Sequence, residues 1–368
     1  MSTIKTPLYL QVAQTLKQRV RTGAYEPGQP LPSVRALGEE FGVSLTVIQK
    51  AVRKLEEARI VVTRPGRGMT VEDADSCSRT ALVFGVIHPY LVSMSFRREV
   101  LEHVDEAFAE RSNFSVMRSS RDDPALERQF AAHLIENGVK GLLIWPTSDD
   151  PNGPFFADLA RQTPVVLIDR LMAGAELPAV IHDYEDGGRA LCRRILDQMS
   201  RRRLLVLMDD LRISAYELLT AGIHSEAARL GRLADVTIVQ LPITRVIHNI
   251  NQSDFSGVDF YEPYVERLIR EGGYDTVFST QDEFLEYVIV ETGLVDRFPE
   301  MQLATMRGIG PNMRCRRYRQ AGVLDLVCDS TAMVARAADL LQRWVLERQP
   351  AGQVIRLKPE LAYSRLER

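Results

Sequence analysis

The chain has 368 residues and a formal net charge of −3, and 45% of its residues are hydrophobic, which allows a small domain and a larger two-lobed one. No stretch reaches the roughly 18 consecutive apolar residues of a membrane span, and the first residues lack the apolar core of a signal peptide, so we expect a cytoplasmic protein with no membrane partner. The four cysteines are far apart and no histidine has zinc-finger spacing, so neither a disulfide framework nor a metal site is indicated.

Charge divides the chain into two parts. Residues 1–71 hold eleven Lys or Arg against five Glu, a net charge of +6, whereas the remaining residues hold 35 basic and 44 acidic side chains, a net charge of −9. A basic segment followed by an acidic one is what a protein needs if only the first part is to contact phosphate. The segment 1–71, which we call the head, is therefore the candidate DNA-binding domain.

The head begins with an amphipathic pattern. Apolar residues recur every fourth position from Leu8 to Val20, and Gly23 follows as a stop, which predicts a first helix. The segment 25–32 is too rich in proline to be helical, so it predicts an extended connector.

Two short helices joined by Gly-Val-Ser predict a helix-turn-helix. Ser33 is placed to cap the first helix, which ends at Gly42, and Ser44 is placed to cap the second, which runs to about Ala58. The outer face of the second helix is polar and available to a major groove of DNA. That face consists of Thr46, Gln49, Lys50 and Arg53.

A hairpin is predicted after these helices, because β-prone residues lie on both sides of the segment 64–68. Its glycine-rich tip carries the guanidinium groups of Arg64 and Arg67. A wing of this kind can lay Gly66 and Arg67 against a minor groove or the phosphates.

In this order, the residues of the head resemble the winged helix-turn-helix of the GntR family of bacterial transcription regulators. The resemblance implies DNA contacts at Arg35, Ser44 and Thr46 and in the wing from Gly66 to Gly68. It rests on Pro7-Leu-Tyr9, Gly23, Pro27-Gly28, Leu31-Pro-Ser-x-Arg35, Leu37, Phe41-Gly-Val-Ser44, Thr46-Val47, Ala51, Leu55 and Gly66-Arg-Gly68.

Two positions of the head depart from the family, which usually has arginine where this chain has Leu45 and Gln49. We therefore expect a different operator, in which Leu45 meets a thymine methyl and Gln49 bonds the N6 and N7 edge of adenine. Alone, an amphipathic helix is more often plain core packing and a glycine-rich tip an ordinary turn. The ordered set, together with the net charge of +6, is what favours DNA binding.

Residues 72–80 are polar and without periodicity, and we take them as a linker. In the body, residues 81–368, short apolar runs alternate with helical patterns, which predicts an α/β fold of parallel sheets flanked by helices. About 290 residues are many for one sheet, so we expect two lobes with a ligand cleft beyond the carboxyl ends of the strands. Strands are predicted at 81–87, 141–145, 165–168, 204–208, 236–241, 276–279 and 302–306, and helices at 96–110, 126–137, 187–199, 215–230, 261–272 and 284–295.

The body resembles the effector domain of the LacI family, itself similar to periplasmic sugar-binding proteins. A GntR-type head on a LacI-like body is the architecture of arabinose-repressor-like regulators of sugar operons. The resemblance implies a sugar between the lobes, with Phe96 against its ring and with Asp149 and Asp282 accepting hydrogen bonds from its hydroxyl groups. The matching stretches are 84–89, 139–144, 164–170, 180–188, 202–207, 274–282 and 331–341.

The predicted pocket also departs from the family. Leu219 stands where the family has a sugar-binding arginine, three residues before Gly222, and the loop that begins at Arg307 lacks the family's aspartate. Arg307 could instead favour an anionic ligand. Structural alternatives remain open as well, because Asp149 could belong to a turn and Asp282 could cap a helix.

The leading interpretation is an allosteric transcription regulator, a homodimeric repressor of operator DNA controlled by a sugar or sugar derivative. No catalytic motif and no cofactor site are found. The alternative is an enzyme, because GntR heads are also fused to aminotransferase-like domains that hold pyridoxal phosphate on a lysine, for which Lys140 and Lys358 are poorly placed. A transport-type binding protein is disfavoured by the basic head.

Overall fold

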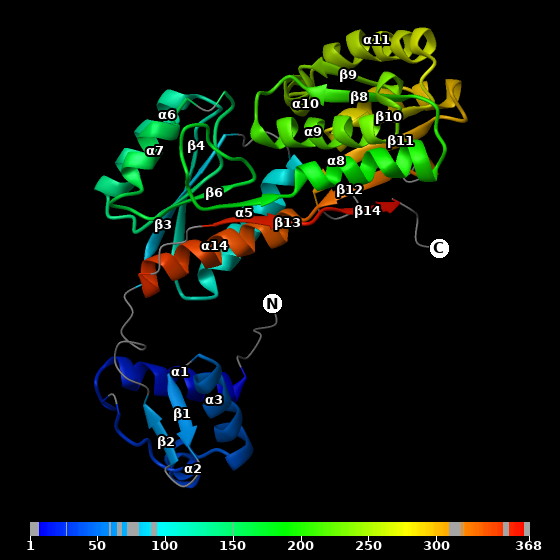
Figure 1. Ribbon diagram of the computed structural model, residues 1–368. Coiled ribbons are helices and arrows are strands. Elements are labelled where there is room, and N and C mark those ends of the chain that lie inside the picture. Colours follow the sequence, from blue (N-terminus) through cyan, green and yellow to red (C-terminus); the bar gives the residue numbers. More distant parts are fainter. Residues whose placement is uncertain are drawn as a thin grey trace. The chain divides into compact units, whose positions relative to one another are not determined.

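The computed structural model describes residues 7–26, 28–58, 60–64, 68–71, 81–89, 94–149, 151–308, 318, 320–348 and 353–363. The chain divides into two compact units, Met1–Ala81 and Leu82–Arg368 (Figure 1). The predicted linker, residues 72–80, lies outside the described residues.

The described residues of the first unit form three helices and a two-stranded sheet, as the sequence predicts. Its elements are α1 (Leu8–Arg21), α2 (Val34–Phe41), α3 (Leu45–Glu57), β1 (Val61–Arg64) and β2 (Gly68–Val71). The helices pack on one apolar core, in which Leu16, Leu37 and Ile48 are fully buried. The strands pair antiparallel, with Val61 opposite Val71. Burial of the apolar faces of α1, α2 and α3 stabilises these short helices, which would be only marginally stable in isolation.

The predicted connector, residues 25–32, is extended only in its second half. The N–H of Gln29 donates to the carbonyl of Glu26 at 3.0 Å and Gly28 has a φ of +78°, so a turn precedes the residues that pair with β2. The backbone N–H of Leu31 donates to the carbonyl of Met69 at 2.8 Å, and the N–H of Val71 donates to the carbonyl of Gln29 at 2.9 Å. The connector thereby satisfies backbone groups that would otherwise lie at the open edge of the hairpin.

The helix-turn-helix differs from the prediction at one cap. Ser33 caps α2, since its Oγ accepts from the N–H of Ala36 at 3.2 Å, and Gly42 ends that helix at a φ of +63° that favours glycine. Ser44 has the extended backbone of a cap, but its side chain makes no capping hydrogen bond to α3. The predicted Ser44 cap is therefore wrong, and the first N–H groups of α3 receive no hydrogen bond from this side chain.

The second unit contains two six-stranded sheets, each the centre of one lobe. The first lobe has the strand order β13-β7-β6-β5-β3-β4 and is parallel throughout. The second lobe has the order β14-β12-β11-β10-β8-β9 and is parallel except for β14. The bounds are β3 (Val83–His88), β4 (Phe114–Ser119), β5 (Leu142–Ile144), β6 (Val165–Ile168), β7 (Ala179–His182) and β13 (Val354–Leu357), then β8 (Leu204–Asp209), β9 (Val236–Leu241), β10 (Thr276–Ser279), β11 (Gln302–Gly308), β12 (Leu324–Cys328) and β14 (Glu360–Tyr363).

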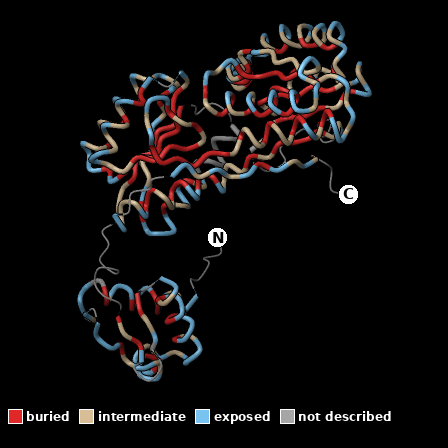
Figure 2. Tube along the Cα trace, viewed as in Figure 1, coloured by how far each residue is buried: buried red, intermediate tan, exposed pale blue. Residues whose placement is uncertain are grey.

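Helices cover both faces of each sheet, and the buried residues run along the strands between them (Figure 2). In the first lobe, α5 (Met94–Ala109) and α14 (Ser330–Glu347) lie on one face and α6 (Pro124–Glu136) and α7 (Gly153–Leu159) on the other. In the second lobe the helices of one face are α8 (Tyr184–Arg193) and α9 (Ser214–Arg229), and those of the other are α10 (Ile243–Asn251), α11 (Ser256–Gly272), α12 (Asp282–Phe284) and the π-helical η3 (Leu285–Glu291). The remaining turns are η1 (Arg194–Gln198), η2 (Leu233–Asp235) and η4 (Leu294–Arg297).

The chain passes between the lobes three times, after β7, after β12 and after β13. The first and third passages are joined, because the N–H of Asp183 donates to the carbonyl of Leu357 at 2.7 Å. Asp183 and Asp329 then cap α8 and α14 through their Oδ1 atoms. The connections between the lobes are therefore anchored at the starts of α8 and α14. A motion of one lobe relative to the other would have to change the backbone angles of these few connecting residues.

All seven predicted strands are present within a few residues of their predicted bounds, but five further strands were not predicted. Of these, β13 and β14 are edge strands whose residues alternate between exposed and half-buried, so they lack a continuous apolar run. The predicted helix 261–272 begins earlier, at Ser256, and Pro263 lies inside it. The helix predicted at 284–295 is a π-helical turn that ends at Glu291, and the one predicted at 187–199 begins at Tyr184.

Candidate functional site

The polar face of α3 is exposed as the sequence predicts. Thr46, Gln49, Lys50 and Arg53 are all exposed, and they share one helix face because they follow the spacing i, i+3, i+4, i+7. The opposite face is buried against the head's core. The exposed face therefore takes no part in folding and is free to meet a ligand such as a DNA groove.

The residues next to this face are also exposed, and they lie at the start of α3 or in α2. Leu45 is 47% exposed and is the first residue of α3. It directly follows Ser44, whose side chain does not cap the helix. Arg35 is exposed in the first turn of α2. A helix start with free N–H groups attracts phosphate. Leu45 and Ser44 thus lie where a DNA backbone or base edge would approach.

The cations of the head fall into two groups. Arg19 bonds to Glu40 and stacks over the Phe41 ring at 5.1 Å, and Lys54 pairs with Glu57, so these two charges serve the fold. Among the described residues, Arg35, Lys50 and Arg53 have no carboxylate partner. Their charge is available to phosphate.

The predicted wing is only partly described. β1 ends at Arg64, whose side chain is not described, and β2 begins at Gly68 with a φ of +77°. Gly66 and Arg67 lie outside the described residues. Their predicted contacts with DNA stay predictions.

In the first lobe of the body, polar groups converge at the carboxyl ends of β5 and β6. Trp145 Nε1 donates to Asp169 Oδ2 at 2.9 Å, and the hydroxyl of Tyr184, at the start of α8, donates to Asp169 Oδ1. Arg170 donates to the carbonyl of Pro146 at 2.8 Å and lies 3.6 Å from Asp169 Oδ2. Asp169 therefore connects the carboxyl ends of β5 and β6 with Tyr184, the first residue of α8 in the second lobe.

His88, at the end of β3, lies beside this cluster. Its ring packs edge-on against Trp145, with 4.8 Å between centroids. Burial, and then the charge of Arg170, lower the pKa of His88 to about 3. His88 is therefore uncharged at physiological pH, and its neutral ring borders the polar groups around Asp169.

In the second lobe, polar groups converge at the carboxyl ends of β8 and β10. The N–H of Asp209 donates to Thr280 Oγ1 at 3.1 Å, and Gln281 Nε2 donates to the hydroxyl of Tyr216 at 3.2 Å. Asp209 and Thr280 are each 1% exposed. Burial raises the pKa of Tyr216 well above its ordinary value, and the charge of Arg170, from the first lobe, partly opposes that rise. Strand ends of both lobes therefore face one shared region.

Contacts between the lobes close one side of that region. The N–H of Asp149 donates to the carbonyl of Arg212 at 2.9 Å, and the two side chains pair at 3.5 Å. The N–H of Leu171 donates to Ser214 Oγ at 2.7 Å. These bonds connect the β5–α7 and β6–β7 loops of the first lobe with the segment after β8.

The four effector residues predicted from the sequence fall in different places. Asp149 lies in a turn at a φ of +59° and pairs with Arg212. Asp282 is the first residue of α12, where its Oδ1 accepts from the N–H of Glu283 at 2.9 Å. Arg307 donates from Nε to Asp325 Oδ2 at 2.9 Å, and Phe96 lies in α5 with its side chain not described.

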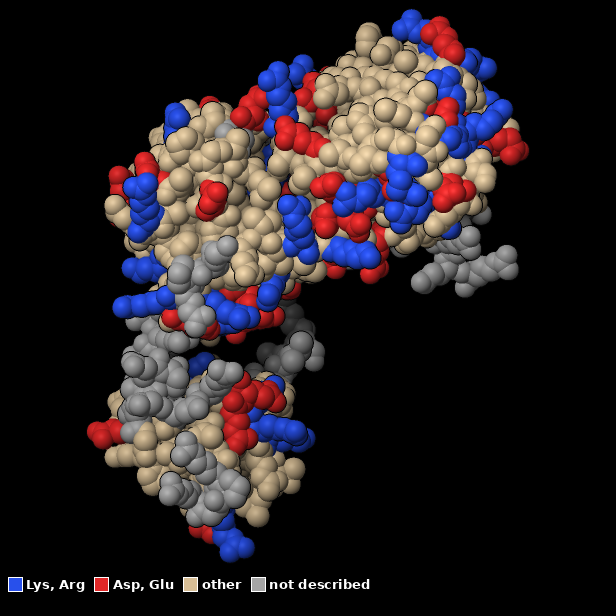
Figure 3. Space-filling model, in the orientation of Figure 1, with Lys and Arg blue, Asp and Glu red and all other residues tan. Residues whose placement is uncertain are grey.

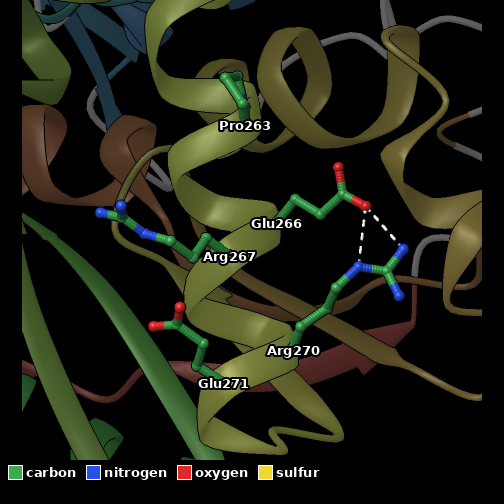
Figure 4. Close-up of a pocket in the computed structure, with 5 residues that line it drawn as sticks. All are labelled: Pro263, Glu266, Arg267, Arg270 and Glu271. Atoms are coloured by element: carbon green, nitrogen blue, oxygen red, sulfur yellow. Dashed lines mark hydrogen bonds and ion pairs between the residues drawn. The ribbon is translucent and has the colours of Figure 1, made fainter.

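A separate depression of about 310 Å³ lies along α11 and is lined by Pro263, Glu266, Arg267, Arg270 and Glu271. Figure 4 shows that all five residues come from one helix and that Glu266 is bonded to Arg270. Ligand sites usually combine polar groups from several elements. We therefore assign this depression to the solvated surface of the body, where acidic and basic side chains are interspersed (Figure 3).

Comparison with known proteins bears on the head first. Residues 8–71 match the sequence profile of the bacterial regulatory proteins of the gntR family. The head is a GntR-type helix-turn-helix domain. The chain is also 22% identical over 203 residues to the arabinose metabolism transcriptional repressor of Geobacillus stearothermophilus, a match that covers 54% of this chain and 55% of that protein. The chain thus spans about half the length of this relative.

Solved structures bear on the body that follows the GntR-type head. A LacI transcriptional regulator from Lactobacillus brevis is 17% identical with a TM-score of 0.61 over 76% of this chain and all of that chain. The Cra dual regulator of Pseudomonas putida, solved in complex with fructose 1-phosphate, is 18% identical with a TM-score of 0.62 over 77% of this chain and 98% of that chain. The body therefore has the fold of LacI-type regulators, as the sequence resemblance implies.

Sequence reasoning did not select several residues that the structure brings together in this body. Asp169, Trp145, Asp209, Tyr216 and Gln281 were not chosen, although three of them directly follow or end a buried strand. That position is the available signal, because polar residues at the carboxyl ends of parallel strands face the ligand region. In place of the family's arginine, Leu219 is fully buried in the core of the second lobe.

Asp209 provides a prediction about stability. Burial raises its pKa from the ordinary 3.8 to about 6, so the native state binds a proton more tightly than the unfolded chain does. This contribution to stability is present below about pH 4 and is lost as the pH rises through about 6, a cost of up to about 3 kcal/mol at pH 7. The variant Asp209→Asn should therefore melt at a higher temperature than the wild type at pH 7 and show little difference near pH 4. A lower melting temperature at pH 7 would show that the carboxylate stabilises the fold.

Proposed function

We propose that this chain is a transcription regulator whose GntR-type head binds operator DNA and whose two-lobed body binds a small effector. The observation that carries the proposal is the exposed face of α3, where Lys50 and Arg53 lie unpaired among the described residues, in one chain with a LacI-type body. A face without a structural role and a body built to enclose a ligand suit an allosteric repressor.

The proposed DNA contacts fall into two sets. Base contacts come from the start and outer face of α3, and phosphate contacts come from its basic residues and from the wing. The regulator acts as a homodimer in the cytoplasm and binds half-sites about one helical turn, roughly 34 Å, apart. The contacting residues are Arg35, Ser44, Leu45, Thr46, Gln49, Lys50, Arg53, Arg64, Gly66, Arg67 and Gly68.

The proposed effector is a sugar or sugar derivative bound between the lobes of the body, residues 81–368, which the linker 72–80 joins to the head. Support comes from the strand-end groups of both lobes and from the names of the relatives, an arabinose metabolism repressor and a regulator solved with fructose 1-phosphate. The proposed effector site includes the residues predicted from the sequence, which are Phe96, Asp149, Asp282 and Arg307. It also includes the cluster around Asp169, which consists of Trp145, Asp169, Arg170 and Tyr184.

The experiment that tests the DNA-binding half uses fluorescence anisotropy on the purified full chain. A promoter fragment from upstream of the chain's own gene should bind with a Kd in the range of about 10⁻⁸ M or tighter, and the affinity should fall steeply with added salt. A fragment of equal length with shuffled sequence is the control. Equal affinity for both fragments would contradict sequence-specific regulation.

The enzyme alternative is not supported by the fold. Lys140 and Lys358, the lysines considered as pyridoxal phosphate carriers, are both exposed, whereas such a lysine works in an enclosed site that desolvates its amine. The body is a LacI-type fold. A transcription regulator is therefore the function that the fold supports best.

A further inference from the structure

We infer that Asn113 and Gln342 of the first lobe are positioning residues, which couple the connections between the lobes to the point where the linker enters the body. The inference rests on the proposed function and deepens it, since it names a route through which the state of the body reaches the DNA-binding head.

Leu82 lies directly before β3 and is the first residue of the second compact unit. Both of its backbone groups are bonded. Its carbonyl accepts from the N–H of Phe114 at 2.9 Å, which extends the pairing of β3 with β4. Its N–H donates to the side-chain Oδ1 of Asn113 at 3.1 Å. The residue that follows the linker is therefore held in part by a side chain rather than by the sheet alone.

The amide of Asn113 continues from Leu82 to α14. Its Nδ2 donates to Gln342 Oε1 at 2.7 Å, and Gln342 Nε2 donates to the carbonyl of Ala107 in α5 at 3.0 Å. Asn113 is 7% exposed and Gln342 is 1% exposed. Three hydrogen bonds therefore join the start of β3, the turn after α5 and the helix α14, away from solvent.

These two amides lie beside an apolar core that α5 and α14, which run side by side (Figure 1), form with the first-lobe sheet. Phe108 and Leu341, close to the amides in sequence, are fully buried in that core, and Leu82 packs against it. Burial of an amide is costly unless its groups are paired. A satisfied polar network fixes one arrangement of the elements that it joins. The network therefore fixes Leu82 relative to α14.

α14 connects this network with a connection between the lobes. The helix begins at Ser330, directly after the connection that follows β12, and Asp329 caps it by accepting from the N–H of Ala332 at 2.8 Å. Gln342 lies about 18 Å further along the helix axis. Because buried side chains of α14 pack on the sheet, the helix moves as one piece. A change at Asp329 is therefore passed to Gln342 and on to the start of β3.

A second link joins the same turn to the same helix, but it lies at the surface. Arg111 donates to Asp339, and the side-chain exposures are 38% and 28%. Asp339 also pairs with Arg343 at 2.9 Å, so it keeps a cation when Arg111 is removed. Exposed ion pairs of this kind are weak. Arg111→Ala is therefore a matched control, since it removes a contact between the turn and α14 but leaves the bond to Leu82.

The test measures hydrogen exchange by mass spectrometry on the purified full chain, with and without a saturating promoter fragment from upstream of the chain's own gene. Because coupling is reciprocal, DNA bound to the head should affect the body. In the wild type, the amides of residues 326–336 should exchange at least about 5-fold more slowly with the fragment bound, the lower end of ordinary coupling. These residues form the end of β12 and the start of α14. Unchanged exchange in the wild type would overturn the inference.

The variant Gln342→Met keeps a similar volume and removes both hydrogen bonds of the amide. It should bind the fragment within about 2-fold of the wild-type affinity, because DNA contacts are local to the head. It should nevertheless lose most of the protection that the fragment causes at residues 326–336, whereas Arg111→Ala should keep it. Plain destabilisation would instead raise exchange in these residues with and without DNA. Full protection in a folded Gln342→Met variant would contradict the role of this residue.

Thermal melts check the folding of both variants, and Gln342→Leu serves as a second variant should the methionine fail to fold. Anisotropy on the same samples separates this inference from the proposed function. If the promoter fragment binds no more tightly than a shuffled fragment of equal length, the proposed function fails and the inference falls with it. If the fragment binds specifically but the Gln342 variants keep the protection, the proposed function stands and the inference fails.

Discussion

The double variant Lys50→Ala/Arg53→Ala should bind its promoter fragment about 10- to 100-fold more weakly than the wild type. Both side chains are exposed on the outer face of α3 and have no carboxylate partner among the described residues, so each can neutralise one phosphate. The loss of two phosphate contacts should also reduce the slope of log affinity against log salt by about 2. Anisotropy titrations at three or more salt concentrations measure both quantities.

Lys54→Ala is the matched control for that experiment. Lys54 lies on the same helix but pairs with Glu57, so its removal should leave the salt slope nearly unchanged. An equal loss in Lys54→Ala and in the double variant would mean that the effect is one of overall charge rather than of the α3 face. An unchanged slope in the double variant would remove α3 from the DNA interface.

The second large effect is expected in the body. In Gly222→Ala, the unfolding free energy should fall by on the order of 3 kcal/mol. A Cβ at Gly222, on α9, would lie 2.0 Å from the carbonyl oxygen of Glu185 on α8, and one at Gly188 would lie 2.4 Å from the carbonyl oxygen of Leu219. Backbone atoms cannot move aside as a side chain can, so the two helices would have to separate. Denaturant unfolding followed by circular dichroism measures the change.

Ala221→Ser is a suitable control, because Ala221 is exposed and directly precedes Gly222 on the same helix. The added hydroxyl meets solvent, so only a small helix-propensity cost of about 0.5 kcal/mol is expected. A Gly222→Ala variant as stable as this control would show that α8 and α9 do not depend on their close approach.

The head could be predicted from the sequence almost completely, because each element is marked by local chemistry. The turn needs Gly42 at a positive φ, the cap needs Ser33, and the apolar stripe around Leu37 fixes the buried face. The error at Ser44 arose because the sequence shows which residue can cap a helix but not whether its hydroxyl hydrogen-bonds to the helix N–H groups.

The body could be predicted only in outline, because edge strands and ligand-facing residues carry weak sequence signals. β13 and β14 alternate in burial and lack apolar runs, so a sheet neighbour far away in the chain decides their conformation. The pairing of Arg307 with Asp325 joins two neighbouring strands, and no spacing rule predicts it. Asp169 and Asp209 could have been found by asking which polar residues directly follow or end a buried strand.

In the proposed regulator, the effector site of the body and the DNA-binding face of the head are coupled, and such coupling is reciprocal by thermodynamic necessity. The most direct measurement therefore determines the Kd for the promoter fragment with and without a saturating sugar effector, and the Kd for that sugar with and without saturating promoter fragment. We expect both ratios to be equal and to fall between about 5 and 150. Sugar binding that leaves the DNA affinity unchanged, with both ratios equal to one, would contradict it.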